Sequence, residues 1–485
     1  MSEMDVKKKF SLDVGWAFVA SMIPLIIGFI LRILFGNYLG ASGLGLYSLV
    51  LIVYSIATLI AALGIPSATV RYVAELKDKK DELNSFISCS LINSIIFGTI
   101  FAIVLYFSSN YISLFFHKPD LTPLIQIISV GIPFFVLSNT IFRLFNGLRK
   151  MGYYSFGIIF RSVLILIFSL VFIFINLGIN GPVLAIAISE IVTTFFVLIL
   201  SKNIFSFIIK DYFKETKQLI RFGIQLVLND GTYFLDTSVD TIIVGYFLTS
   251  QEVGIYSIAI MFAQLLFVIP GAIAQVTYPV LTEFYHKKLT DAMKSTLSKS
   301  IKYSFFISSI IGLGLILFSS NIISILLPPI FQQAVIPLSI IIFSLILYAP
   351  FTSIGSLWNA VGKPHIIFIL GIIWVTINAI VNITLIPIYG ILGAAIATST
   401  TYIIRPFPGF YLWNRLLNIK IDPWWYIKSW GILGLLIIIF FYFKSYINAD
   451  LLKIIILLTW IGILTQFLIS NNEKQEIIKL IKHFI

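Results

Sequence analysis

Apolar runs of about 20 residues follow one another along almost the whole chain, and short polar segments separate them. A run of about 20 apolar residues is long enough to cross the ~30 Å hydrocarbon core of a bilayer as an α-helix. The runs are continuous rather than alternating, which disfavours a transmembrane β-barrel. We therefore predict an all-α integral membrane protein with about 14 transmembrane helices. The predicted spans are 14–35, 43–65, 85–107, 121–143, 154–176, 181–201, 219–247, 253–275, 301–320, 334–357, 366–386, 390–413, 429–443 and 451–470.

Lysine and arginine residues are distributed unequally between the two sides that these spans imply. With the N-terminus in the cytoplasm, 27 of the 33 lysines and arginines fall on the cytoplasmic side, and Lys118, Lys444 and Lys453 fall on the outer side. Positive residues accumulate in the cytoplasmic loops of membrane proteins. A miscounted span would move every later loop to the other side. We therefore expect a multi-pass protein of the plasma membrane with both termini in the cytoplasm.

Three sequence motifs recur in the same order at almost one spacing, which indicates an internal repeat. The offsets are 209, 213 and 212 residues, and the pairs are LGASGLGLYSL (39–49) with LTSQEVGIYSI (248–258), LFNGLRK (144–150) with LWNAVGK (357–363), and GINGPVLA (178–185) with GILGAAIA (390–397). One period covers six spans, an even number, so both copies enter the membrane in the same direction. Parallel repeats of this kind are related by an axis along the membrane normal.

The repeat predicts two pseudo-symmetric six-helix lobes and a C-terminal helix pair. The linker is expected to form an interfacial helix, because Lys210, Lys214 and Lys217 lie at helical spacing opposite apolar residues. The predicted parts are an N-terminal lobe (1–202, spans 1 to 6), a linker helix (203–218), a C-terminal lobe (219–415, spans 7 to 12), and spans 13 and 14 with a cytoplasmic tail (416–485).

Composition narrows the possible functions of the chain. It is 59% hydrophobic and 11% charged, with a mean hydropathy of +1.01 and a net charge of +12. The positive charge is spread over cytoplasmic loops, where it orients spans and meets anionic lipid, so we do not expect a nucleic-acid partner. Cys89 is the only cysteine and the four histidines lack ligand spacing, so neither a disulfide within the chain nor a metal cofactor is expected.

Asp236 and Asp240 stand one turn apart in span 7, on one face of the helix. Two close carboxylates repel each other unless a proton or a cation shares the site. This arrangement fits a site for Na⁺ or H⁺ coupling, and it fits equally a structural pair with an arginine or a hydrated cavity wall. The repeat places Arg32 of span 1 at nearly the depth of Asp240, so the two are candidates for a cavity salt bridge.

Arg161 in span 5 and Arg405 in span 12 lie in the cytoplasmic halves of their spans, and arginine suits phosphate oxygens. We identify Arg32, Arg161 and Arg405 as candidates for binding an anionic headgroup. The alternative for each arginine is a side chain that extends to the lipid headgroups. Glu190 in span 6 has no evident partner, and the sequence assigns it no role.

Several motifs resemble those of a known family. These are LRILFGNYLGASGLGLYSLV with GIPSATVRYVAE (64–75), DTIIVGYFLTSQEVGIYSIA (240–259), LWNAVGKP (357–364) and NITLIPIYGILGAAIAT (382–398). They look like the polysaccharide-biosynthesis flippases of the multidrug/oligosaccharidyl-lipid/polysaccharide (MOP) superfamily, and the resemblance covers about 400 residues.

This resemblance implies two bundles, arranged as in multidrug (MATE) transporters and lipid II flippases, around a cavity that opens alternately to either side. It implies translocation of a polyprenyl- or dolichyl-(pyro)phosphate-linked oligosaccharide from the cytoplasmic to the outer leaflet, for surface polysaccharide or glycan assembly. Spans 13 and 14 look like the extra pair of the lipid II flippases, which lines a groove for the polyprenyl tail. The span-1 arginine pattern of those flippases is absent, which argues against a peptidoglycan precursor. We expect a monomer that performs no covalent chemistry and contacts membrane lipids.

Two other functions remain open at this stage. A MATE-type multidrug antiporter would bind organic cations at the acidic residues of span 7. A membrane enzyme such as a glycan polymerase would need a large external loop, and the longest external loop here has roughly a dozen residues.

Overall fold

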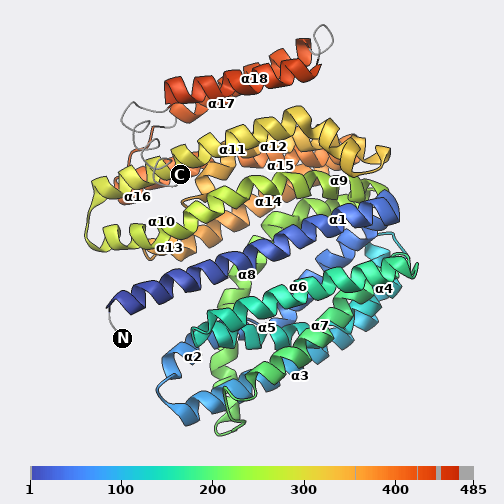
Figure 1. Cartoon of the computed structure of the whole chain (residues 1–485), viewed down its shortest axis with the longest axis vertical. Coiled ribbons are helices and arrows are strands. Elements are labelled where there is room, and N and C mark those ends of the chain that lie inside the picture. Colours follow the sequence, from blue (N-terminus) through green and yellow to red (C-terminus); the bar gives the residue numbers. More distant parts are fainter. Residues whose placement is uncertain (1–2, 356, 423, 444–448, 469–485) are drawn as a thin grey trace. The chain divides into compact units, whose positions relative to one another are not determined.

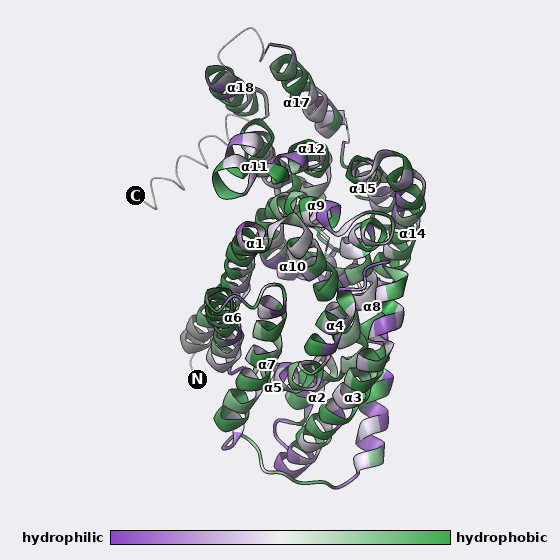
Figure 2. Ribbon diagram, turned by 90° about the vertical axis from the view of Figure 1, so that its right-hand side faces the viewer, coloured by the Kyte–Doolittle hydropathy of each residue, from purple (hydrophilic) through white to green (hydrophobic). Residues whose placement is uncertain are grey.

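The computed structural model describes residues 3–355, 357–422, 424–443 and 449–468, and these residues form helices and turns without any β-strand (Figure 1). Hydrophobic residues dominate most of the helices (Figure 2). The all-α membrane fold predicted from the sequence is therefore confirmed. The predicted tail that follows span 14, and the loop 444–448 with Lys444, lie outside the described residues.

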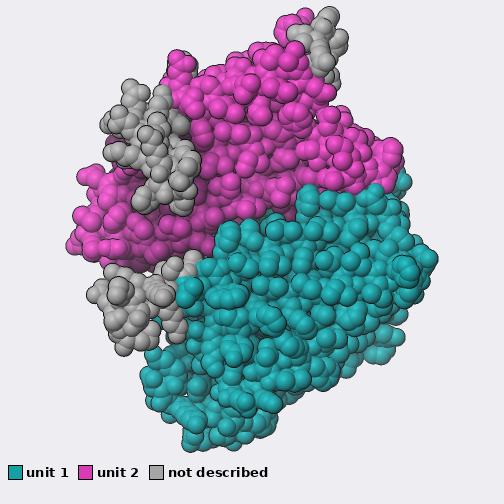
Figure 3. All heavy atoms as spheres, in the orientation of Figure 1, with its two compact units in different colours: residues 1–257 teal, residues 258–485 magenta. Residues whose placement is uncertain are grey.

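The chain divides into two compact units, residues 1–257 and 258–485 (Figure 3). The first unit contains α1 (Glu3–Ala62), α2 (Ile65–Leu76), α3 (Lys80–Phe115), α4 (Leu121–Ser129), α5 (Ile132–Gly147), α6 (Met151–Phe174), α7 (Asn180–Ser201), α8 (Tyr212–Phe247) and the start of α9 (Ser250–Ala263). Within it, α7 packs against α6, α5 and α4, and α1 packs against α6.

The second unit is built around α11, α12 and α15, and α17 and α18 pack beside them. After the end of α9 it contains η1 (Gln264–Phe267), α10 (Val268–His286), α11 (Thr290–Leu326), η2 (Pro329–Ala334), α12 (Val335–Thr352), α13 (Leu357–Ala360), α14 (Pro364–Tyr389), α15 (Ile391–Ile404), α16 (Pro406–Leu417), α17 (Trp424–Phe443), α18 (Ala449–Ile463) and a π-helical turn (Leu464–Leu468).

Within the described residues each predicted span falls on a helical segment, but the segments are not all separate long helices. In the described part of the chain, nine helices are long and apolar enough to cross a membrane, or ten if the bent pair α4 and α5 is one span. Spans 1 and 2 are joined in α1 across a kink at Gly40. The helix α8 carries three aspartates, and α15 and α18 have only 14 and 15 residues. These features explain why the number is lower than the predicted one.

The repeat is visible in the backbone as well as in the sequence. Gly178 and Gly390, which the motifs align, have φ values of 56° and 58° and each precede a helix. Arg149 and Gly362 are aligned in the same way and also have positive φ values, 54° and 72°. Left-handed backbone is favourable for glycine and costly for most other residues. Equivalent turns therefore both have a positive φ, even where Arg149 replaces a glycine.

The two copies of the first motif also contact each other reciprocally. A Cβ atom on Gly45 would lie 1.8 Å from the carbonyl oxygen of Ser250, and one on Gly254 would lie 1.9 Å from that of Ala41. The repeat offset of 209 makes Ala41 equivalent to Ser250 and Gly45 equivalent to Gly254, so the two contacts are equivalent to each other. A contact in which each partner uses the same surface is the mark of a two-fold relation. The crossing of α1 and α9 thus follows the symmetry that the repeat predicts.

The linker before α8 differs from its prediction. Residues 205–209 have no regular secondary structure and the helix begins only at Tyr212, so a helix over 203–218 is wrong for its first half. The backbone N–H groups of this segment bond to side chains on α3: Ser206 to Asn84, Ile208 to Ser88 and Lys210 to Ser85, at 3.2, 3.1 and 3.0 Å. Because α3 supplies these acceptors, the segment has no need of helical hydrogen bonds.

The compact units do not follow the predicted lobe boundary. By its contacts α8 belongs to the first unit, which ends at residue 257, whereas the repeat assigns α8 to the second lobe from residue 219. The helix packs against α1, α2 and α3. Division into lobes by repeat stays a prediction about symmetry, and it is distinct from this division by packing.

Candidate functional site: a polar pocket, a buried ion pair and an apolar cavity

A polar pocket of about 240 Å³ lies within the first unit, between α1, α2, α5 and α8. Largely apolar helices contribute several polar and charged side chains to its wall. These are Ser55, Thr58, Ser67, Asn139, Arg143 and Asp230. Charged groups inside membrane helices are costly and usually face a cavity or a partner. The pocket is therefore the candidate site for a polar ligand in this unit.

Arg143 is the cation of this pocket, and sequence reasoning missed it. It is the last residue of the predicted span 121–143, where a charge reads as part of the cytoplasmic loop, whereas it lies in α5 and lines the pocket with Asn139 one turn earlier. Its charge interacts with that of Asp230 on α8. The spacing of Asn139 and Arg143, four residues apart on one helix face, is the signal that could have identified the pair.

Arg161 and Glu190 form an ion pair between α6 and α7. The distance from Arg161 Nη1 to Glu190 Oε1 is 3.8 Å, and the Arg161 guanidinium lies over the rings of Phe135 and Phe142, at 5.2 and 5.6 Å. The Glu190 side chain is 3% exposed and that of Arg161 is 21% exposed. The structure thus gives Glu190 the partner that the sequence could not identify.

The polar atoms around this ion pair are incompletely satisfied. Arg161 Nη1, Glu190 Oε2 and the hydroxyl of Tyr54 are buried, and none has a hydrogen-bond partner among the described residues. Tyr54 on α1 interacts electrostatically with both charged groups, and its ring contacts Phe135 at 5.7 Å. Buried polar groups without partners are rare in folded proteins, so such a group calls for an explanation.

Two of the remaining predicted residues, Arg32 and Asp240, interact with the tyrosines of the repeated motif. The Tyr256 hydroxyl donates a hydrogen bond of 2.9 Å to Asp240 Oδ2, and Arg32 interacts electrostatically with Tyr47. Tyr47 and Tyr256 are equivalent in the repeat, so the two copies place opposite charges beside the same tyrosine. Asp240 is buried and Asp236 is half-buried. A salt bridge between Arg32 and Asp240 stays a prediction.

Arg405 is enclosed by aromatic rings in the second unit. It lies at the junction of α15 and α16, its guanidinium is 5.3 Å from the rings of Tyr348 and Tyr402 and 5.9 Å from Trp374, and it donates a 3.4 Å hydrogen bond to the Tyr348 hydroxyl. Cation–π contacts of this kind stabilise a desolvated guanidinium. The role of Arg405 in headgroup binding stays a prediction.

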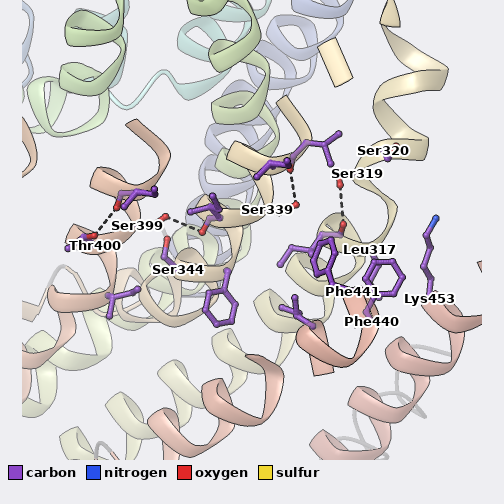
Figure 4. A pocket seen from close by; sticks show the side chains of 18 residues that line it. Leu317, Ser319, Ser320, Ser339, Ser344, Ser399, Thr400, Phe440, Phe441 and Lys453 are labelled. Carbon is purple, nitrogen blue, oxygen red and sulfur yellow. Dashed lines mark hydrogen bonds between the residues drawn. The ribbon is translucent and has the colours of Figure 1, made fainter. Parts of the chain in front are cut away.

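The second unit contains a large apolar cavity of about 810 Å³ (Figure 4). Residues of α11, α12, α15, α17 and α18 line it, and the hydroxyl groups at its wall are mostly bonded to carbonyls, as Ser399 is to Ile340. Among the described residues Lys453 is the one charged group that lines it, and its ammonium group bonds to Asn321 and Asp450 at 2.6 and 2.9 Å. The cavity therefore suits a hydrocarbon chain.

The described residues offer no group of three or more histidine, cysteine, aspartate or glutamate side chains that would hold a metal ion.

Comparison with known families decides the affiliation of the chain. The family model described as polysaccharide biosynthesis protein matches residues 12–285, which is more than half of the chain. The chain belongs to the polysaccharide biosynthesis protein family. The MatE family model also matches, over residues 232–384, so the resemblance to the MOP superfamily seen in the sequence is confirmed.

Curated relatives of this family member come from archaea and bacteria. An uncharacterized membrane protein of Methanocaldococcus jannaschii is 26% identical over 93% of both chains. A probable low-salt glycan biosynthesis flippase of Haloferax volcanii is 26% identical over 50% of this chain and 51% of its own length. A putative O-antigen transporter of Shigella flexneri is 23% identical over 83% of this chain and 97% of its own.

Solved structures share the fold of this family member. A lipid II flippase in an inward closed conformation has a TM-score of 0.73 and 19% identity, over 93% of this chain and 98% of its own. An inward-facing MATE multidrug resistance transporter has a TM-score of 0.68 and 18% identity, over 86% of this chain and 99% of its own. These likenesses establish the fold of a multi-pass membrane protein of this superfamily.

Proposed function

We propose that the chain is a flippase that moves a lipid-linked oligosaccharide from the cytoplasmic to the outer leaflet by alternating access. The carrier would be a polyprenyl or dolichyl (pyro)phosphate, and the product would serve surface polysaccharide or glycan assembly. The membership in the polysaccharide biosynthesis family carries this proposal, and two relatives are named as flippase and O-antigen transporter. The chain performs no covalent chemistry in this scheme.

The two kinds of site in the chain fit an amphipathic substrate of this class. The pocket with Arg143 and Asn139 offers a cation and hydrogen-bonding groups to a phosphorylated sugar. The cavity in the second unit offers an apolar wall to the hydrocarbon tail.

A transport assay with the protein reconstituted in vesicles tests the role of the pocket. We expect Arg143→Ala to lower the initial rate of flipping of a fluorescent polyprenyl-phosphate sugar at least about tenfold, because a charge-assisted contact to phosphate contributes about 1.5–3 kcal/mol. Arg415→Ala is the matched control, since Arg415 is exposed and bonds only to Tyr411 among the described residues. Equal rates for both variants and the wild type would remove Arg143 from the mechanism.

Coupling to Na⁺ or H⁺ at Asp236 and Asp240 is part of this proposal. The hydrogen bond from Tyr256 shows that Asp240 is held by the fold, and Asp236 is partly accessible. We expect Asp236→Asn and Asp240→Asn to abolish the dependence of transport on an imposed ion gradient. Unchanged gradient dependence in both variants would leave the aspartates a structural role.

The orientation of the chain, with both termini in the cytoplasm, is a further part of the proposal. In a Cys89→Ser background, a cysteine at exposed Thr249 should react with an impermeant thiol reagent from outside the cell, and one at exposed Lys288 only after permeabilisation. The reverse pattern would invert the assigned direction of transport.

A MATE-type antiporter is the second candidate, because the MatE model matches residues 232–384. Its organic cations would be repelled by Arg143 and Arg161, the cations of the first unit's pocket and ion pair. The same vesicles, tested with a fluorescent organic cation, distinguish the two functions.

A further inference from the structure

The Glu190 carboxylate is enclosed by the first unit with one weak partner. It lies on α7, which packs against α6, α5, α4 and α1. Arg161 on α6 and Tyr54 on α1 are the groups that interact with it. The cation of α5, Arg143, interacts with Asp230, and α4 contains no titratable residue.

The Arg161 and Glu190 side chains are close enough to attract each other but too far apart to share a hydrogen bond. At 3.8 Å the two charges attract each other, but Arg161 Nη1 makes no hydrogen bond and Glu190 Oε2 has no partner among the described residues. A close carboxylate–guanidinium pair normally shares hydrogen bonds of 2.7–2.9 Å, roughly the strongest that proteins form. An ionised carboxylate without such bonds is poorly compensated at this burial.

The Arg161 side chain is accessible where that of Glu190 is not. It is 21% exposed, against 3% for Glu190. Phe135 lies under its guanidinium and also lines the polar pocket that contains Arg143. Phe135 therefore borders both the pocket and Arg161, and Glu190 occupies the position of an anion that would compete for Arg161.

We propose that Arg161 exchanges the Glu190 carboxylate for the phosphate of the substrate, and that Glu190 takes up a proton when this happens. This rests on the proposed function, since it assigns the phosphate to the lipid-linked sugar. The proton comes from water and binds a carboxylate oxygen of Glu190, which becomes a neutral acid. Phosphate binding and proton uptake at Glu190 then favour each other. A bound phosphate takes up the Arg161 guanidinium that stabilises ionised Glu190, and protonation removes the Glu190 charge that competes with phosphate for Arg161.

Proton uptake on binding tests this exchange directly. The probe is farnesyl diphosphate, titrated by calorimetry into the full-length protein in detergent, in two buffers of different ionisation enthalpy. We expect the wild type to take up about one proton per bound ligand, so that affinity rises up to about tenfold for each unit by which the pH falls. We expect E190Q to bind without proton uptake and without this pH dependence.

Further titrations, with two variants and with two alternative ligands, identify the ligand and the residues that bind it. R161A should lose binding at least about tenfold, the effect of removing one charge-assisted bond. E283Q, a change at an exposed glutamate that bonds to Lys287, should keep the wild-type proton uptake. Inorganic phosphate and farnesol separate a free phosphate site from a site for prenyl phosphates: binding of inorganic phosphate with equal affinity and proton uptake would remove the lipid from the proposal.

Several results would overturn the exchange. They are no binding of farnesyl diphosphate by the wild type, binding without proton uptake, or unchanged proton uptake in E190Q. An independent readout is the infrared C=O band of a protonated carboxylic acid, which should appear with ligand in the wild type and be absent in E190Q. Sugar-lipid flipping with no such proton uptake would contradict only the exchange. Proton-linked binding without flipping would contradict only the proposed function.

Discussion

Lys118 illustrates how a single buried side chain fixes the end of a long helix. It lies between α3 and α4, is 8% exposed, and its ammonium group donates hydrogen bonds to the carbonyls of Phe116, Gly245 and Leu248. The last two carbonyls belong to the end of α8, where the helix dipole is negative. Burial lowers the pKa of Lys118, and the charge of Glu252 opposes that effect.

Removing this ammonium group should weaken the end of α8. We predict that Lys118→Met lowers the free energy of unfolding by on the order of 3 kcal/mol, because buried carbonyls lose their donor. Thermal unfolding in detergent measures this, and Lys80→Met, at an exposed position on α3, is the control. A midpoint equal to that of the wild type would show that water replaces the lysine.

The sequence identified which residues were unusual more readily than it identified their partners. Arg161 and Glu190 both stood out as charges inside apolar runs. Their contact depends on how α6 and α7 rotate against each other, which hydropathy does not determine. Arg143 was missed for a different reason, since a charge at the end of a predicted span is indistinguishable from a loop charge. Lys118 was correctly placed in a loop, but its burial follows from packing alone.

At the scale of elements, the irregular segment 205–210 before α8 is held by side chains of α3. We predict that Ser85→Ala with Ser88→Ala increases amide hydrogen exchange over residues 206–210 about tenfold or more, because two N–H groups lose acceptors. Ser90→Ala is the matched control: Ser90 is buried on α3 and bonds to its own helix, at Phe86. Unchanged exchange in the double variant would show that the segment is held by other contacts.

The spacing of three lysines predicted a helix for this segment, and the first half of that prediction was wrong. Helical periodicity shows which side of a segment is polar. It does not show that side chains of a distant helix accept the hydrogen bonds of the segment's backbone N–H groups. The transmembrane helices were predicted more successfully because the bilayer leaves a long apolar run few alternatives to an α-helix.

The crossing of α1 and α9 should tolerate no side chain at its glycines. We predict that Gly45→Ala lowers the free energy of unfolding by about 2–4 kcal/mol, because a Cβ atom would lie 1.8 Å from the Ser250 carbonyl oxygen and the helices would have to separate. Gly28→Ala, also in α1, has open space around it and should be neutral or slightly stabilising. Equal effects of the two changes would contradict the close crossing.

For the whole molecule, the repeat was the most informative feature of the sequence. It predicted two equivalent copies, and the positive φ values at Gly178 and Gly390 and the reciprocal contact at Gly45 and Gly254 agree with that equivalence. It did not predict that α8 packs with the first unit, since a repeat describes equivalence and not which neighbour buries more surface. Nor did it indicate that equivalent tyrosines would meet opposite charges, Arg32 beside Tyr47 and Asp240 beside Tyr256.

The claim that the chain moves lipid-linked sugars across the membrane is central, and transport by the purified protein tests it most directly. Liposomes containing the protein receive a fluorescent polyprenyl-phosphate sugar in one leaflet, and an impermeant quencher reports its arrival in the other. A parallel set receives a fluorescent organic cation. We predict protein-dependent translocation of the sugar lipid and none of the cation. Transport of the cation without movement of the sugar lipid would contradict the account.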